Sequence, residues 1–173
     1  GSQDADEEYY KLGLDARRKV IPPRVDKTFY ANYNAHFVSS FLLAGVLLDR
    51  PGLAKFALTS LDKLLGQASE DEGLPHFWNG EKSGLRGLLV DHASVLQALL
   101  DAYEYSGKEY YVRRAARIAD YSLRTLYDEK KWGFFDIPES PIQLGELRVR
   151  DKPLDENSMM ASGLTRLSHV TGE

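Results

Sequence analysis

Residues 87–135 are the most informative stretch of the sequence. They predict two helices joined by a tight turn at Ser106-Gly107, because Gly107 can take the left-handed conformation that closes a helix. The first helix is apolar except for one narrow stripe, and the second has a polar face opposite an apolar one. A helix that is apolar nearly all round is buried, whereas a helix with one apolar face covers a core. The segment therefore predicts a hairpin of an inner and an outer helix.

A related unit recurs on either side of this hairpin. A shift of 58 positions aligns Leu42 with Leu100, Ala44 with Ala102, Ala57 with Ala115, Asp62 with Asp120, Leu65 with Leu123 and Phe77 with Phe135. A shift of 65 positions aligns Leu99 with Leu164 and Ser106-Gly107 with Thr171-Gly172. Repeats of this kind are typical of supersecondary units that bury their faces against neighbouring copies. We therefore expect further helices at residues 34–49, 51–67 and 156–171, with an extended segment at 74–78. Acidic residues early and basic residues late, as the helix dipole prefers, indicate another helix at 4–20, and alternation indicates a short strand at 146–150.

Three polar pairs open the expected inner helices, and the two shifts superimpose them. These pairs are Tyr33-Asn34, Asp91-His92 and Glu156-Asn157. If the inner helices run parallel around a ring, the pairs gather on one rim. Helix N-termini carry unpaired N–H groups and partial positive charge, so such a rim favours polar or anionic ligands.

Composition limits the possible partners and the localisation of the chain. The chain has 173 residues, a formal net charge of −4 and no cysteine. No Lys/Arg block and no apolar run of membrane-spanning length occur, so we expect neither a nucleic-acid nor a membrane partner. Gly1-Ser2 is typical of a tag remnant, which leaves 3–173 as the expected domain. Without a visible signal peptide, the simplest expectation for localisation is cytoplasmic.

The order and spacing of several motifs resemble a known family. The motifs that carry the resemblance are Asp26-Lys27-Thr28-Phe29-Tyr30 with Tyr33-Asn34-Ala35, Gly87 to Ala93, Leu99 to Tyr105 with Gly107, Trp132 to Asp136, and Lys152-Pro153 with Asp155-Glu156-Asn157-Ser158. They are similar to signatures of the thioredoxin-domain proteins related to spermatogenesis-associated protein 20. The chain departs from that pattern at Tyr33, where Trp is usual, and at His36, where an apolar residue is usual.

The resemblance implies a fold. Proteins of this family carry a thioredoxin-like domain followed by an (α/α)-barrel similar to N-acylglucosamine 2-epimerases and six-hairpin glycosidases. The expected helices make three inner and three outer members, about half of such a barrel. We therefore expect an all-α fold, an αα-hairpin toroid that forms about half of an (α/α)6 barrel, with short β-hairpins between helix pairs. A half barrel exposes an apolar edge, so we also expect a homodimer.

Asp91 and His92 are the strongest candidates for chemistry. A rim carboxylate beside an imidazole can act as general acid or base on a sugar. The structural alternative is that Asp91 caps the helix and His92 packs against the neighbouring rim. Glu156, with Asp155, allows a paired-carboxylate site with Asp91, although acids at helix starts are more often caps and dipole partners.

The remaining candidates are aromatic or histidine residues. Trp78, Trp132 and Tyr33 lie at loops or helix starts, where they either stack on a sugar or fill the end of the barrel. The histidines are not spaced as metal ligands, and neither a Gly-rich phosphate loop nor a dinucleotide fingerprint occurs. We therefore expect neither a metal nor a cofactor.

Three function classes remain open. The favoured one is an accessory or carbohydrate-binding module of a thioredoxin-fused protein. The second is an epimerase- or glycosidase-like enzyme that uses Asp91 and His92, with Tyr33, Asn34, Glu156, Asn157, Trp78 and Trp132 binding the sugar. The third is a protein-interaction scaffold.

Overall fold

The computed structural model describes residues 3–69, 71–80, 82–139 and 149–172, and most of them are helical. The helices are α1 (Gln3–Lys11), α2 (Leu14–Arg17), α3 (Ala31–Leu47), α4 (Pro51–Leu65), α5 (Leu89–Ser106), α6 (Glu109–Thr125) and α7 (Leu154–Thr171). The strands are β1 (Phe29–Tyr30), β2 (Pro75–Trp78) and β3 (Ser83–Arg86). The predicted all-α class is confirmed.

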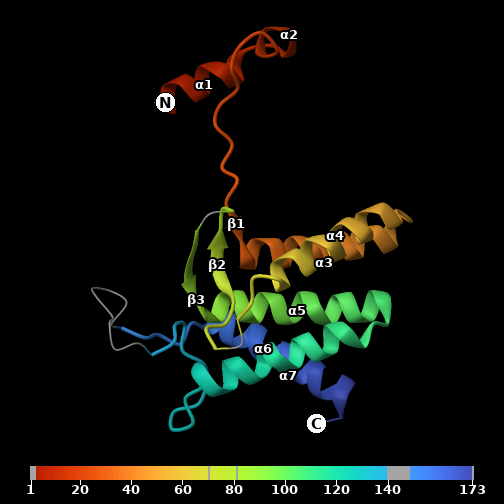
Figure 1. Cartoon of the computed structure of the whole chain (residues 1–173), viewed down its shortest axis with the longest axis vertical. Coiled ribbons are helices and arrows are strands. Elements are labelled where there is room, and N and C mark those ends of the chain that lie inside the picture. Colours follow the sequence, from red (N-terminus) through yellow and green to blue (C-terminus); the bar gives the residue numbers. More distant parts are fainter. Residues whose placement is uncertain (1–2, 70, 81, 140–148, 173) are drawn as a thin grey trace.

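The helices form two hairpins and a final inner helix (Figure 1). α3 packs on α4 and on α5, and α5 also packs on α6 and α7. The Ser94 hydroxyl on α5 lies 3.2 Å from His36 Nε2 on α3 and 3.7 Å from Met159 Sδ on α7. These partners are 58 and 65 positions apart, the same shifts that superimpose the sequence repeats. The three inner helices therefore lie side by side in parallel, in the register that the repeat predicts.

The N-terminal segment differs from the prediction of one outer helix at residues 4–20. Gly13 is extended (φ −66°, ψ 161°) and separates α1 from α2. Figure 1 shows both helices on an arm that leaves the body at β1. Their sequences, QDADEEYYK and LDAR, offer no apolar face that could cover a core. Among the described residues, the body therefore has two outer helices, α4 and α6, rather than three.

Two of the inner helices, α5 and α7, end at the predicted glycines. Gly107 (φ 66°) closes α5 and Gly172 (φ 79°) closes α7, both in the left-handed conformation. The N–H group of each glycine donates to the carbonyl four residues earlier, at Tyr103 and Ser168 respectively. A side chain is strained at such a φ value, which is why glycine stands at both positions.

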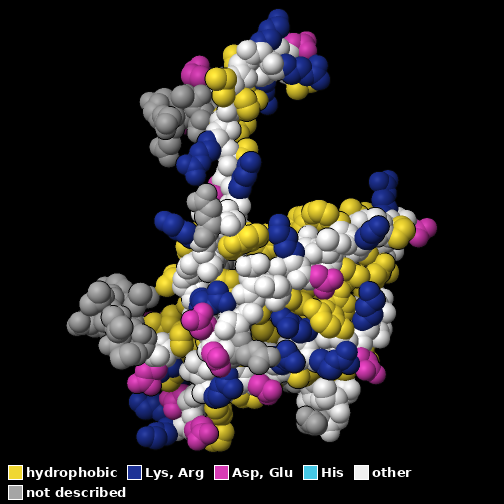
Figure 2. All heavy atoms as spheres, in the orientation of Figure 1, with side chains coloured by type: hydrophobic (Ala, Val, Ile, Leu, Met, Phe, Trp, Pro, Cys, Tyr) yellow, Lys and Arg dark blue, Asp and Glu magenta, His cyan; other side chains and the backbone are white. Residues whose placement is uncertain are grey.

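α5 and α3 differ in how much of each helix is buried. Eleven residues of α5 are buried, as expected for a helix surrounded by neighbours, whereas α3 buries only one side. The other side of α3 exposes Tyr33, Phe37, Leu43, Val46 and Leu47, which we call the α3 open face. Figure 2 shows hydrophobic side chains at the surface over α3 and α4. The apolar edge expected of a half barrel is thus present.

The strands form one antiparallel sheet in the order β1-β2-β3, beside the N-terminal ends of α3 and α5 (Figure 1). The β2–β3 hairpin between α4 and α5 agrees with the expectation, whereas pairing of β1 with β2 was not predicted. The strand expected at residues 146–150 lies mostly outside the described residues. Among the described helices, none is both long enough and apolar enough to cross a membrane.

Gly163 sets the distance between α7 and α5. A Cβ atom at this position would lie 2.6 Å from Leu96 Cδ2 and 2.9 Å from Leu96 Cγ, and Leu96 is fully buried. Overpacking of a core costs about 1–3 kcal/mol, so we expect Gly163→Ala to destabilise the protein by about 1–2 kcal/mol despite its better helix propensity. Gly52→Ala in α4 is the matched control, because nothing lies within 4 Å of its added Cβ. Chemical denaturation measures both variants, and equal midpoints would contradict the prediction.

Candidate functional site

The first turns of α3, α5 and α7 share one structural device. The fourth residue of each helix is Asn34, His92 or Asn157, and each donates a side-chain N–H to the carbonyl of the residue before its helix. The bonds are Asn34 Nδ2 to Tyr30 O at 2.7 Å, His92 Nδ1 to Leu88 O at 2.8 Å and Asn157 Nδ2 to Pro153 O at 2.8 Å. The second residues of the three superimposed pairs therefore have equivalent positions and equivalent bonds.

His92 and Asn157 each make a second bond, and the two bonds are equivalent. The N–H group of Leu74 points to His92 Nε2 at 3.4 Å, and the N–H group of Phe134 donates to Asn157 Oδ1 at 2.7 Å. In both repeats the side chain thus joins the start of an inner helix to the extended tail of the preceding hairpin. This geometry also assigns the tautomer of His92, with the proton on Nδ1 and an acceptor at Nε2.

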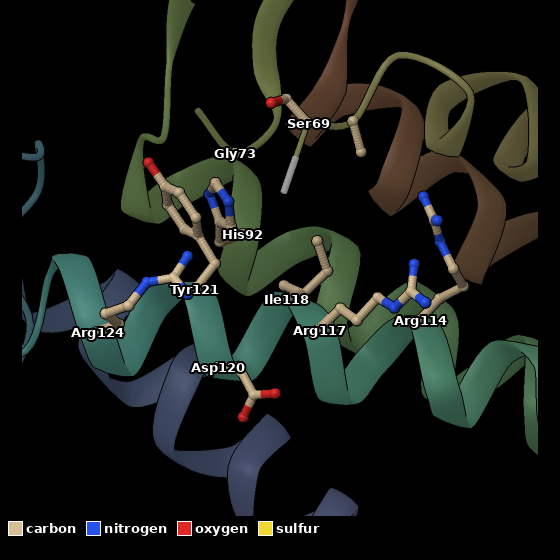
Figure 3. Close-up of a pocket in the computed structure, with 10 residues that line it drawn as sticks. Ser69, Gly73, His92, Arg114, Arg117, Ile118, Asp120, Tyr121 and Arg124 are labelled. Carbon is tan, nitrogen blue, oxygen red and sulfur yellow. The ribbon is translucent and has the colours of Figure 1, made fainter. Parts of the chain in front are cut away.

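His92 is buried on the side that faces α6. Its ring is fully buried and stacks on Tyr121, with centroids 4.7 Å apart and planes at 13° (Figure 3). Burial lowers the pKa of His92 to about 4, against the small opposing effect of its bond to Leu88. A neutral, enclosed imidazole of this kind supports packing, so the structural alternative for His92 agrees with the geometry.

Asp91 is fully buried and faces the opposite direction, toward α3. Its Oδ1 accepts the N–H of Asn32 at 3.1 Å, so Asp91 caps the neighbouring helix α3 rather than its own helix. His76 Nδ1 on β2 lies 3.0 Å from Oδ2 and 3.2 Å from Oδ1. Burial raises the pKa of Asp91 to about 6, although the nearby His76 and the bond from Asn32 act to lower it.

His76 connects the buried carboxylate to the surface. Its side chain is 26% exposed, whereas that of Asp91 is 0% exposed. Tyr30 lies beside His76, with ring centroids 5.7 Å apart, and Tyr33 lies beside Tyr30 at 6.0 Å. Tyr33 is 68% exposed. The residues Tyr33, Tyr30, His76 and Asp91 thus form a continuous row, which we call the rim row, from solvent to the buried start of α5.

His76 is the site residue that the sequence analysis missed. It is one histidine in a short extended segment, and its partner Asp91 lies fifteen positions later. No local spacing indicates this pair, because it forms only where β2 passes the first turn of α5. The general preference of a buried carboxylate for a hydrogen-bonding partner was the one available signal.

The other candidate residues from the sequence analysis lie outside the rim row. Trp78 is half-buried against α4, with Lys63 Nζ 5.2 Å from the centre of its ring. Trp132 is 74% exposed on the loop between α6 and α7, and Glu156 is half-buried in the first turn of α7. Within the described part of the chain, no group of three or more His, Asp or Glu residues is placed to hold a metal ion.

Comparisons with known proteins find proteins similar in sequence and others similar in fold, although no protein-family model matches the sequence. The chain is 26% identical to human spermatogenesis-associated protein 20 over 175 positions, which cover 92% of this chain and 22% of the human protein. It is 28% identical to the rat protein of the same name, again over 22% of that protein. The chain therefore spans about a fifth of the length of these curated relatives.

Two solved structures resemble the fold. A GH76 α-mannanase of Bacteroides thetaiotaomicron superimposes with a TM-score of 0.69 at 13% identity, over 88% of this chain and 43% of the enzyme. An α-amylase from Clostridium perfringens gives a TM-score of 0.56 at 14% identity, over 84% of this chain and 38% of the enzyme. At these identities the likeness concerns the fold alone. The chain is thus similar in sequence to one part of spermatogenesis-associated protein 20 and has the helical architecture of the (α/α) toroid glycosidases.

Proposed function

We propose that this chain is an accessory, carbohydrate-binding part of a toroid domain, in a longer protein that also carries a thioredoxin-like domain. The observation that carries the proposal is the rim row, in which the exposed Tyr33 is joined through Tyr30 to an imidazole held by a buried carboxylate. Aromatic faces pack on the apolar faces of sugar rings, and fixed polar groups bind the hydroxyls. The carboxylate of Asp91 accepts the Nδ1 proton of His76, which leaves His76 Nε2 as an acceptor for a sugar hydroxyl.

The test is a thermal-shift screen of monosaccharides, α-mannan oligosaccharides and maltooligosaccharides. The last two probes are included because the two proteins of similar fold are an α-mannanase and an α-amylase. We expect stabilisation by at least one saccharide, with a loss of affinity of about ten-fold in Tyr33→Ala, because truncating an aromatic binding residue commonly costs more than 1 kcal/mol.

Tyr105→Ala is the matched control for this screen. Tyr105 is 40% exposed and lies near the C-terminal end of α5, whereas the rim row contacts its N-terminal end. We expect this variant to keep saccharide binding. No response to any saccharide, or equal losses in the two tyrosine variants, would contradict the proposal and favour the protein-interaction scaffold.

A second candidate function is an epimerase- or glycosidase-like enzyme. It is supported by the raised pKa of Asp91, since shifted pKa values cluster at catalytic sites. Here the accessible acid–base group is His76 rather than His92, and Asp91 orients its ring. NMR detection of epimerised or hydrolysed saccharide separates this function from binding alone, and His76→Gln is expected to abolish turnover.

We also propose that the isolated chain forms a homodimer through the α3 open face. The interface of a two-fold dimer must be complementary to itself, and charges of one sign would repel each other across it. α3 carries no Asp, Glu, Lys or Arg among its 17 residues and exposes several large apolar side chains. Exposed apolar patches of this kind are typical of interaction surfaces.

We expect Leu43→Asp to make the chain monomeric, because each copy in a dimer would bury the new charge without a partner. Sedimentation measures the change as a rise of at least about ten-fold in the dimer dissociation constant, or about 1.4 kcal/mol. Leu154→Asp is the control, since Leu154 is 79% exposed at the start of α7. A wild-type chain that stays monomeric at high concentration would rule out the dimer.

A further inference from the structure

A second polar site lies on the outer side of the domain, between α6 and the loop that follows α4. Arg114, Arg117, Tyr121 and Arg124 recur at intervals of three or four residues, which places them along one face of α6. Opposite them, Ala68, Ser69 and Gly73 complete a cavity of about 320 Å³ (Figure 3). This volume is at the lower end of the range for small-molecule sites, about 300–1,000 Å³.

The described residues that line the cavity carry a net positive charge. They include three arginines and one acidic residue, Asp120. Figure 3 shows the Asp120 carboxylate pointing away from Ser69 and Gly73, on the other side of α6. His92 forms part of the wall, and burial lowers its pKa to about 4, so it is uncharged at neutral pH and the positive charge comes from the arginines. Close by, the carboxylate of Glu72 lies 3.2 Å from Arg86 Nε.

Arg114 and Tyr121 are held in place by bonds to the backbone of the neighbouring segment. Arg114 donates to the carbonyl of Leu65 at 2.8 Å, and this bond uses one of the five N–H groups of its guanidinium. Tyr121 donates its O–H to the carbonyl of Glu72 at 3.3 Å, which keeps the loop beside α6. A guanidinium that also bonds within the protein keeps further donors for a ligand, so the site does not require unpaired arginines.

We propose that this cavity binds a small phosphorylated molecule. Guanidinium groups match phosphate oxygens in a two-pronged geometry, and several of them on one helix face can hold one phosphate group. The Ile118 side chain and the Tyr121 ring offer apolar contacts to the rest of the ligand. The site is separate from the rim row, so the proposal does not depend on carbohydrate binding there.

Calorimetric titration with inorganic pyrophosphate at low ionic strength tests the proposal. We expect one binding event per chain, weakened at least about ten-fold in Arg117→Gln and in Arg124→Gln, because each variant loses charge-assisted hydrogen bonds to the ligand. Arg113→Gln is the matched control. It removes the same charge from the same helix, but Arg113 is an exposed residue paired with Glu109 at 3.2 Å and lies outside the cavity.

The outcomes separate a specific site from diffuse attraction. Arg117→Lys keeps the charge but loses the forked geometry, so we expect it to bind more weakly than wild type and more tightly than Arg117→Gln. Circular dichroism verifies that each variant is folded. Absence of pyrophosphate binding to the folded wild-type chain would overturn the proposal, as would an equal loss in Arg113→Gln.

Discussion

The stability difference between wild type and the His92→Asn variant is expected to grow by about 3 kcal/mol as pH rises from 4 to 6.5. Burial lowers the pKa of His92 from 6.5 to about 4 in the folded chain. Between these two values the unfolded chain takes up a proton that the folded chain does not. His92 therefore supports folding above pH 6.5, and that support is lost as pH falls toward 4.

Asparagine is the informative replacement because the fold already uses it at the equivalent positions. Asn34 and Asn157 make the bond to the preceding carbonyl that His92 makes to Leu88. The variant thus keeps a donor at this point and loses the titrating ring with its stack on Tyr121. At pH 7 we expect a loss of about 2 kcal/mol from the smaller side chain and the lost stacking, and near pH 4 we expect the variant to be the more stable protein.

Denaturant unfolding over this pH range measures the effect. His92→Gln is the second variant, since it also cannot titrate but fills the space differently. Both variants should show the same pH slope relative to wild type, whatever their stability at pH 7. A difference that stays constant from pH 4 to 7 would show that His92 is not held neutral by burial.

The features that were predictable from the sequence depend on local physics. Gly107 and Gly172 end their helices because few residues tolerate a left-handed conformation, and this preference acts wherever the glycine stands. The hydrophobic pattern of α5 predicts burial on nearly all sides of the helix, and the structure confirms this prediction. The two shifts also aligned positions 34, 92 and 157, which occupy equivalent places in the structure, although the sequence analysis interpreted them as a rim for ligands and did not predict their bonds to the preceding carbonyls.

The remaining features depend on which segments meet in space. α3 is as apolar as a buried helix, yet one side of it is open, since burial requires a neighbour that the helix pattern cannot specify. The His76–Asp91 pair and the arginine-lined cavity each join segments from different units. Asp91 illustrates the limit well, because a carboxylate in the first turn of α5 suggested a cap for that helix, whereas it bonds to the first turn of α3.

The stability difference between wild type and the Asp91→Asn variant is expected to depend on pH in the opposite direction to that of His92→Asn. Burial raises the pKa of Asp91 from 3.8 to about 6 in the folded chain, so the folded state holds its proton more tightly. Stability from this group is present below pH 3.8 and is lost as pH rises through 6, by about 3 kcal/mol. Asparagine resembles the protonated acid in shape and can still accept the N–H of Asn32. We therefore expect similar stabilities near pH 4 and a variant about 2–3 kcal/mol more stable than wild type at pH 7.

The same variant shows whether this buried charge serves the proposed site. A carboxylate that lowers stability at neutral pH is typical of a residue retained for function. Unfolding measurements at pH 4 and 7, combined with saccharide titration, distinguish the cases. Higher stability with weakened saccharide binding would show that the charge of Asp91 orients His76 for the ligand, whereas higher stability with unchanged binding would leave Asp91 only its role as a cap for α3. A variant less stable than wild type at pH 7 would mean that the bonds from His76 and Asn32 outweigh the cost of burial, contrary to the raised pKa.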